Sequence, residues 1–400
     1  MKKDVLFLCQ YFYPEYVTSA LLPYQTAKEL VDNHMSVDVL CGYPKEYHSK
    51  KSFSVPKTEL VDGICIKRVN YLQLNRKNAL FRLINYFSFV FSCFLRLTTL
   101  RNYRLVYVYS NPPILPVLTV LANMFFKTKF VFVSYDVYPD IAIETKVLSE
   151  KNPISLIANL ISEQVFYRAE KVVALSQEMK EYLVTQKKVR EDKIQIIPNW
   201  ATEKESKVLS KDNSSKNIIV SYLGNMGLPQ DFDRIEEIIS NEVIKALPIQ
   251  FIFAGHGSRK EKLKEFVISR KLSNVVVYDY LQGQDYDEIL HKSDYHMLSL
   301  NSSLNGLAVP SKFYSYINNE KPVIALIHEE SDIAKDILHY NLGYVIARGE
   351  LMAALKVFTK LVRSKKIHKV KEYKAHFPKE IQLRKYVNLT LEVLAKEKKI

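Results

Sequence analysis

Short apolar, β-branched runs alternate with amphipathic segments along most of this chain, and this alternation constrains the fold more than any other feature. Strands that alternate with helices are typical of βαβ units, in which helices cover both faces of a parallel sheet. The first series predicts strands at Val5–Cys9, Val37–Cys41, Ile64–Val69, Leu105–Tyr109, Phe130–Ser134 and Lys171–Leu175. The second series predicts strands at Ile218–Leu223, Phe251–Ala254, Val275–Tyr280, His296–Leu300, Val323–Ile327 and Tyr344–Ile346.

A polar, charged stretch at residues 202–217 separates the two series, and its composition is typical of a linker or surface loop. The length of 400 residues also exceeds the usual size of one hydrophobic core. We therefore predict an α/β protein with two doubly wound, Rossmann-like domains, 1–200 and 201–375. A C-terminal helical segment, 376–400, could pack back on the first domain. Ligands of such sheets bind outside the carboxyl ends of the strands, so we expect the site in a cleft between facing domains.

The formal net charge of +14 indicates an anionic partner. The sequence has no zinc-finger spacing, no aromatic RNA-binding strand and no helix-turn-helix pattern, so we predict a membrane or phosphorylated ligand and no nucleic acid. The four scattered cysteines form no CxxC pair and predict buried, reduced thiols without a metal site. Asp4 and Pro14 interrupt the N-terminal apolar run, which argues against a signal peptide and for a cytoplasmic protein.

The segment 76–104 is the candidate membrane contact. Its apolar stretch, Leu83–Leu95, is shorter than the ~20 residues that a spanning helix needs. Arg82 and Arg96 bracket this stretch, a pattern that suits a helix lying in the membrane interface. The alternative is a buried helix of the first domain, and the same alternative holds for the apolar helix expected at Pro113–Phe126. We favour a peripheral position on the inner face of the cell membrane.

Glycines follow two strands of the second series. The strand that ends at Leu223 leads into Gly224 and Gly227, and the next strand leads into His256 between two glycines. Glycine lets the backbone approach a ligand closely, and a following helix N-terminus offers free N–H groups to a phosphate. The alternative for each is an ordinary strand-to-helix turn, with His256 as an exposed loop residue.

A third segment opens a helix with Pro310, Ser311 and Lys312. Proline and serine are common at helix starts. A lysine in the first turn opposes the helix dipole, so helix stability does not explain it. A bound phosphate would explain Lys312, and a solvated surface lysine is the alternative.

Two Asp-x-Asp strings, Asp231–Asp233 and Asp285–Asp287, fall at predicted helix starts. Aspartate is favoured there as a cap or first-turn residue, so we interpret both strings as structural and not as metal ligands. The sequence also shows no pair of acids that would suit glycoside hydrolysis.

Taken in order, segments along almost the whole chain resemble a family 4 retaining glycosyltransferase of bacterial surface-polysaccharide biosynthesis. The segments that carry the resemblance are QYFYPEYVTSALLPYQTAKEL at 10–30, YDVYPDIA at 135–142, ALSQEMKEYL at 174–183, IIPNWA at 196–201, YLGNMG at 222–227, FAGHG at 253–257, VPSKFYSY at 309–316 and EKPVIA at 320–325.

The resemblance implies a GT-B fold and sugar transfer from a nucleotide donor to a lipid-linked or polysaccharide acceptor, with retention and without metal or cofactor. The expected donor is linked to uridine diphosphate. Asp136 and Lys312 carry the implied catalytic roles. The implied donor-binding residues of the second domain are Gly224, Asn225, Gly227, Gln230, His256, Tyr280, Leu281, Pro310, Ser311 and Ser315. In the first domain, Glu15, Thr18 and Ser19 are expected in a loop that closes over the donor.

The chain departs from the family pattern in its third donor loop. Leu307 and Ser315 stand where the family has a spaced pair of glutamates, and Glu320 replaces a glycine. A second hypothesis is therefore a non-catalytic or partner-dependent subunit of a surface-polysaccharide or glycoprotein assembly. A third is a GT-B sugar-nucleotide epimerase, for which Asp136 and His256 are the acid–base candidates.

Overall fold

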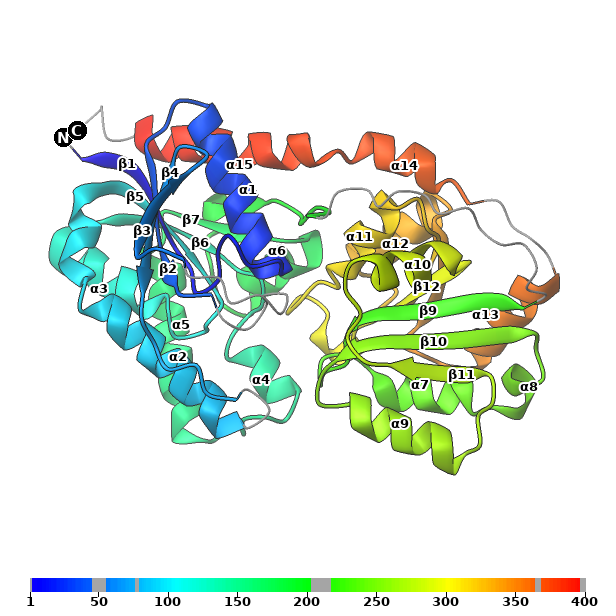
Figure 1. Cartoon of the computed structure of the whole chain (residues 1–400). Helices are drawn as coiled ribbons and strands as arrows, with labels where there is room; N and C mark the ends of the chain where they lie inside the picture. The colour runs from blue at the N-terminus through cyan, green and yellow to red at the C-terminus, as the bar shows by residue number, and fades with distance from the viewer. Residues whose placement is uncertain (1, 45–54, 76–78, 203–216, 364–367, 396–400) are drawn as a thin grey trace. The chain divides into compact units, whose positions relative to one another are not determined.

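The chain forms two compact units of mixed α/β structure (Figure 1). The computed structural model describes residues 2–44, 55–75, 79–202, 217–363 and 368–395. Unit 1 comprises Met1–Thr202, Gly306–Ala308 and Lys379–Ile400, and unit 2 comprises Glu203–Asn305 and Val309–Pro378. Most of the predicted linker and the first residues of the predicted membrane segment, 76–78, lie outside the described residues.

Unit 1 is built on an eight-stranded sheet in the order β3-β4-β2-β1-β5-β6-β7-β8. Its strands are β1 Lys3–Leu8, β2 Val37–Gly42, β3 Thr58–Val61, β4 Ile64–Val69, β5 Tyr103–Tyr109, β6 Lys129–Val133, β7 Lys171–Ala174 and β8 Ile194–Ile196. All six predicted strands are confirmed. β3 and β8 were not predicted, and β3 pairs antiparallel with β4 through a turn at Asp62 and Gly63. Asp-Gly at positive φ is a hairpin signal, so the sequence does carry the reason for β3.

The helices of unit 1 lie on both faces of its sheet. They are α1 Thr18–Asp32, α2 Ala79–Phe94, α3 Val117–Phe126, α4 Asp140–Glu144, α5 Pro153–Arg168, α6 Gln177–Thr185 and α15 Lys379–Ala395, with short 3₁₀ turns η1 Leu97–Asn102 and η2 Glu191–Lys193. α1 links β1 to β2, whereas α3 links β5 to β6 in the opposite direction across the sheet. Right-handed crossovers therefore place these two helices on opposite faces. α15 packs beside α1 on one face, and α3 contacts both α2 and α5 on the other.

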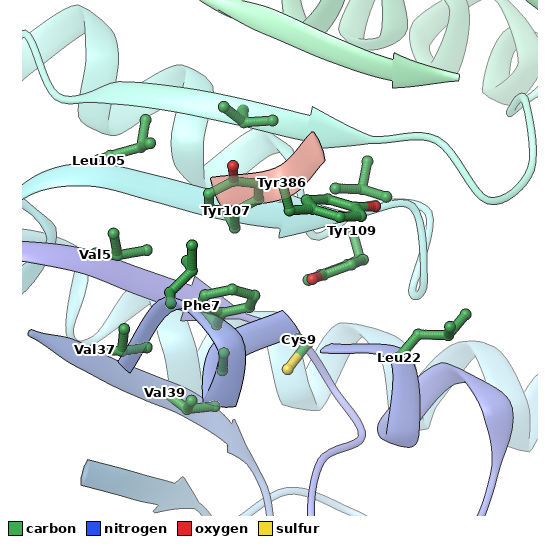
Figure 2. Close-up of a cluster of buried hydrophobic side chains, with 14 of the residues drawn as sticks. Val5, Phe7, Cys9, Leu22, Val37, Val39, Leu105, Tyr107, Tyr109 and Tyr386 are labelled. Atoms are coloured by element: carbon green, nitrogen blue, oxygen red, sulfur yellow. The ribbon is translucent and has the colours of Figure 1, made fainter. Parts of the chain in front are cut away.

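The core of unit 1 joins β4, β2, β1, β5, β6 and β7 to the C-terminal helix α15, and Figure 2 labels part of this cluster. Alternate residues of a strand share one face, so Phe7 and Tyr107 both point to the α15 side, with ring centroids 5.1 Å apart. The Tyr107 hydroxyl lies 2.9 Å from Thr390 Oγ1 on α15, and Tyr386 packs against the Tyr107 ring. This buried contact fixes α15 on unit 1.

Unit 2 is built on a six-stranded, fully parallel sheet in the order β11-β10-β9-β12-β13-β14. Its strands are β9 Ile218–Asn225, β10 Ile249–His256, β11 Val275–Tyr278, β12 Tyr295–Ser299, β13 Val323–Ile327 and β14 Gly343–Ala347. All six predicted strands are confirmed. Its helices are α7 Phe232–Ile239, α8 Glu242–Lys245, α9 Lys260–Ser269, α10 Gln284–Lys292, α11 Lys312–Asn318, α12 Asp332–His339, α13 Leu351–Arg363 and α14 Val370–His376, with the 3₁₀ turn η3 Ser302–Leu304.

The direction of chain travel reverses between β9 and β12, which makes this the topological switch point of unit 2. The two strands pair only at Val220 with Tyr295 and at Ser221 with His296. Beyond these pairs, the Tyr316 hydroxyl from α11 supplies the hydrogen bonds that β9 would otherwise form with a neighbouring strand. It accepts from the Leu223 backbone N–H and donates to the Leu223 carbonyl, each at 3.1 Å. The strands thus diverge where such sheets hold ligands.

Two helix predictions need correction. The amphipathic pattern predicts the first helix at Leu21–Val31, whereas α1 begins three residues earlier, at Thr18, with Val17 as an extended N-cap residue. The helix predicted at Pro113–Phe126 begins later, at Val117, and Pro116 is its N-cap residue. Among the described residues, none of the helices combines the length and the apolar character that crossing a membrane requires.

The cysteines of the described chain are free thiols. Three of them, Cys9, Cys41 and Cys93, are buried, whereas Cys65 is only partly buried on β4, between β3 and β2. Burial raises the pKa of the Cys41 thiol to about 12, so this group stays protonated.

Candidate functional site

The predicted donor residues of unit 2 gather at the carboxyl ends of β9 and β10. The two strands run in register to their last residues, so Gly224 pairs with Gly255 and Asn225 pairs with His256. α11 begins beside them with Lys312. This is the edge at which a doubly wound sheet binds its ligand.

The glycines at this edge have different physical roles. A Cβ atom on Gly255 would lie 1.8 Å from the Gly224 carbonyl oxygen, and one on Gly257 would lie 2.2 Å from the Met226 carbonyl oxygen. Both residues also have positive φ. Gly255 and Gly257 are therefore required by the close packing of the two strand ends. A Cβ on Gly224, in contrast, would meet only the flexible Lys312 side chain, with Cε at 3.3 Å.

Lys312 is the first residue of α11, as predicted. Its N-cap residue Ser311 has helical φ and ψ and makes no side-chain cap hydrogen bond. The lysine side chain extends over Gly224, and its ammonium nitrogen lies 5.4 Å from the centre of the Tyr286 ring on α10. Tyr286 was not singled out from the sequence, although it stands inside the Asp-x-Asp string of that helix.

His256 faces this positive charge. Its imidazole is partly desolvated, and burial, Lys312 and Lys260 together lower its pKa below the ordinary value. The ring contacts Tyr280 edge to face, with centroids 5.1 Å apart. A lowered pKa favours the neutral imidazole, and the positive charges that act on it favour binding of an anion at this edge. Lys260, in the first turn of α9, also pairs with Asp279 at 2.5 Å. The sequence signal for Lys260 was its place directly after the second glycine loop.

The loop after β9 already uses part of its hydrogen-bonding capacity. The Gly227 N–H donates to Gln230 Oε1 at 2.9 Å, and the Met226 N–H donates to the His256 carbonyl. Asn225 is exposed, and its side chain lies against Gly227 and Gly257. The hydrogen bond to Gln230 therefore holds the loop in place, and the side chains of Asn225 and Lys312 lie beside it at the same edge.

The other predicted donor residues differ in exposure. Tyr280 is exposed beyond the end of β11, which stops at Tyr278 and not at the predicted Tyr280. Leu281 is half-buried and packs on the core beneath α11. Pro310 is half-buried, and its carbonyl accepts from the Phe313 N–H. Ser315 is buried within α11.

A buried polar cluster lies beneath the site, which the sequence did not predict. His296 stacks on the Tyr316 ring with centroids 4.4 Å apart, and its Nδ1 lies 2.8 Å from Ser221 Oγ. Burial lowers the His296 pKa to about 3. Because Tyr316 also bonds Leu223, this cluster ties α11 to β9 and so fixes Lys312 over Gly224.

In unit 1, Asp136 follows β6, as predicted. Its backbone N–H donates to Ser110 Oγ at 3.2 Å, and burial raises the pKa of its carboxyl to about 6. The neighbouring Val137 N–H donates to the carbonyl of Leu307, one of the three later residues that belong to unit 1. Leu307 is itself buried.

The loop that was predicted to contain Glu15, Thr18 and Ser19 ends at Val17 in the structure. Glu15 is buried and its N–H donates to the Phe12 carbonyl. Thr18 and Ser19 are not loop residues, because they form the first turn of α1. The extended conformation of Val17 ends the loop there.

The residues of the two Asp-x-Asp strings lie at the N-terminal ends of α7 and α10. Asp231 is the N-cap of α7 and accepts from the Arg234 N–H at 3.3 Å, as predicted. Asp233 forms an ion pair with Arg259. Asp285 and Asp287 lie in the first turn of α10. Within the described part of the chain, no cluster of three or more histidine, cysteine or acidic side chains could hold a metal ion.

Comparison with known proteins agrees with this architecture. Residues 23–202 match the model of Glycosyltransferase Family 4. A curated relative, the probable glycosyltransferase WbjE of Pseudomonas aeruginosa, is 24% identical over 243 residues, which are 59% of this chain and 60% of the relative's length.

Two solved structures show the same fold. One is Alr3699/HepE of Anabaena in complex with UDP, with a TM-score of 0.63 and 13% identity over 98% of this chain and 100% of that chain. The other is the lipopolysaccharide outer core galactosyltransferase WaaB, with a TM-score of 0.62 and 12% identity over 97% of this chain and 99% of that chain. The two-unit α/β architecture is thus the GT-B fold.

Proposed function

We propose that this chain, which carries a glycosyltransferase family 4 domain at residues 23–202 and has the GT-B fold, transfers a sugar from a nucleotide donor. The proposed acceptor is lipid-linked or a polysaccharide, at the cytoplasmic face of a membrane. We further propose that the transfer proceeds with retention, without a metal or cofactor, and that the donor is linked to uridine diphosphate. The UDP complex of the similar Alr3699/HepE supports this choice of nucleotide.

The observation that carries the proposal is the cationic edge of unit 2. The Lys312 side chain extends over Gly224, and burial, Lys312 and Lys260 together lower the pKa of His256, so positive charge lies where β9 and β10 end. In the proposed reaction, the bond between the sugar and the diphosphate breaks and negative charge grows on the departing phosphate. A fixed cation at that point stabilises the transition state more than the ground state.

The remaining predicted roles follow from position. Asn225 and the exposed ring of Tyr280 would contact the donor, with Tyr280 beside the base. Asp136, whose raised pKa leaves it partly protonated near pH 6, would face the transferred sugar or the acceptor. These roles for Asp136, Asn225 and Tyr280 are part of the proposal.

The first experiment is thermal unfolding of the full chain with a panel of nucleotides and nucleotide sugars, with and without magnesium. We expect stabilisation by one nucleoside diphosphate and its sugars, independent of magnesium. Lys312→Ala should remove this stabilisation and lower transfer to a membrane-extracted acceptor by about a hundred-fold or more, a loss typical for one transition-state charge contact.

The matched control is Lys292→Ala, which removes an exposed lysine from the last turn of α10 in the same unit. It should bind nucleotide and turn over like the original chain. Equal turnover by Lys312→Ala and Lys292→Ala would refute the role assigned to Lys312.

A second candidate function rests on the third donor loop. Leu307 and Ser315 are both buried, and neither carries the carboxylate found in the resembling family. A non-catalytic or partner-dependent subunit would bind nucleotide sugar weakly or not at all when purified alone. Donor-dependent product from the purified chain would exclude this alternative.

A further inference from the structure

α2 has two apolar faces, and only one of them packs on the sheet. The inner face is buried through residues such as Phe89 and Cys93. The outer face exposes between 46% and 61% of Leu80, Leu83, Phe87, Phe91 and Phe94. Their spacing of three and four residues places them on one stripe of the helix. A solvated helix would carry polar side chains there.

The two neighbouring helices continue this exposed apolar surface. α3 contacts both α2 and α5 in unit 1. α3 exposes Phe125 by 68%. α5 exposes Ile154, Leu156, Ile157, Leu160 and Tyr167, each by 56% or more. Monomeric proteins rarely leave apolar surface exposed over several adjacent elements unless it binds a partner.

The charges around this surface are mainly positive. α2 carries no charged side chain after Arg82, which lies in its first turn, and Arg96 follows the helix two residues after its end. Exposed Lys127 ends α3, and exposed Lys151 precedes α5 next to the exposed acid Glu150. Glu163 is an exposed acid on α5. Apolar helices with basic ends are typical of segments that lie in the interface of an anionic bilayer.

We propose that α2, α3 and α5 together form one docking surface for a lipid bilayer with anionic headgroups. Their outer side chains enter the boundary between headgroups and acyl chains, and Arg82, Arg96 and Lys127 contact the phosphates. The inference extends the proposed membrane contact of segment 76–104 to two further helices. It rests on the proposed function only for the expectation that the acceptor is at a membrane.

The test is co-sedimentation of the full chain with vesicles of phosphatidylglycerol and phosphatidylcholine, compared with phosphatidylcholine alone. Phe87→Glu on α2 and Leu160→Glu on α5 should each weaken binding to the anionic vesicles at least about ten-fold, because each replaces a large exposed apolar side chain, which would enter the bilayer, with an acid. Ile268→Glu is the matched control, since Ile268 is 76% exposed on α9 of unit 2. It should bind like the original chain.

The basic residues give an independent test. Arg82→Gln and Lys127→Gln should each weaken binding to anionic vesicles about five-fold, with no effect on neutral vesicles. All of these side chains are exposed, so thermal unfolding of the variants should match that of the control.

Three results would overturn the proposal. The first is equal binding to neutral and anionic vesicles. The second is an effect of Phe87→Glu with none of Leu160→Glu, which would confine the contact to α2. The third is a chain that self-associates through these residues and ignores vesicles, which would make a second copy the occupant. Intact vesicle binding by a chain that binds no nucleotide would refute the proposed transferase and leave this surface standing.

Discussion

The strand ends at the candidate site allow a sharp comparison of two identical substitutions. Gly224 and Gly255 are partners in the β9–β10 register, so Gly224→Ala and Gly255→Ala add the same methyl group to adjacent strands. The surroundings differ. At Gly255 the new Cβ would lie 1.8 Å from a backbone oxygen, whereas at Gly224 it would lie 3.3 Å from the end of the Lys312 side chain.

We expect Gly255→Ala to destabilise unit 2 by about 3 kcal/mol. The backbone must move by more than an ångström to relieve the contact, which breaks the last pairs of the ladder at about 1 kcal/mol for each hydrogen bond. An alanine at positive φ adds roughly 1–2 kcal/mol of strain. For a unit of this size, a loss of about 3 kcal/mol lowers Tm by about 6–12 °C.

Gly224→Ala should leave stability within about 1 kcal/mol of the original chain, because a lysine side chain can move by a few tenths of an ångström. It should instead weaken nucleotide binding about three- to ten-fold by displacing the Lys312 ammonium group. Calorimetric unfolding of both variants, followed by nucleotide titration, measures the two effects separately. Equal stability of Gly255→Ala and the original chain would refute the strand register on which the site is built.

Three further predictions concern buried polar side chains that stabilise the two units. Tyr316→Phe removes both hydrogen bonds to Leu223 and should cost about 1–3 kcal/mol in urea unfolding, with weaker nucleotide binding as the additional readout. The folded pKa of His296 is about 3, so its imidazole stays neutral at a pH where the same group in the unfolded chain takes up a proton. The free energy of unfolding should therefore fall as pH drops from about 6.5 towards 3, by at most ~1.4 kcal/mol per pH unit. His296→Gln should lose this pH-dependent contribution. Thr390→Val leaves the buried Tyr107 hydroxyl without its partner and should cost about 1–3 kcal/mol, whereas no change in unfolding would contradict the assigned contact.

The predictions from sequence were strongest for elements with a local pattern. All twelve predicted strands exist, because a buried parallel strand is a short apolar run that needs no knowledge of its neighbours. β3 and β8 were missed because β3 is half-exposed and β8 has three residues, so neither forms such a run. The start of α1 at Thr18 was missed because Val17 supplies no capping side chain.

The candidate site was predicted in part. The sequence placed Gly224, His256 and Lys312 next to strand ends, and parallel strands bring such ends to one edge. It did not separate the glycines that the backbone packing requires from the one that faces Lys312. It also gave no sign of Tyr316, since a tyrosine within an apolar helix has no local feature that reveals its hydroxyl bonding another strand.

The sequence by itself determined that this chain builds two α/β units on parallel sheets, because strand and helix periodicities are properties of consecutive residues. Only the tertiary structure decided which face of each helix is buried and which distant segment covers it. It buried one side of α2 and left the other exposed, and it bonded Thr390 of α15 to Tyr107 of β5 across most of the chain length. Such contacts depend on where distant segments meet, and an amphipathic pattern states only that a face is apolar and not what covers it.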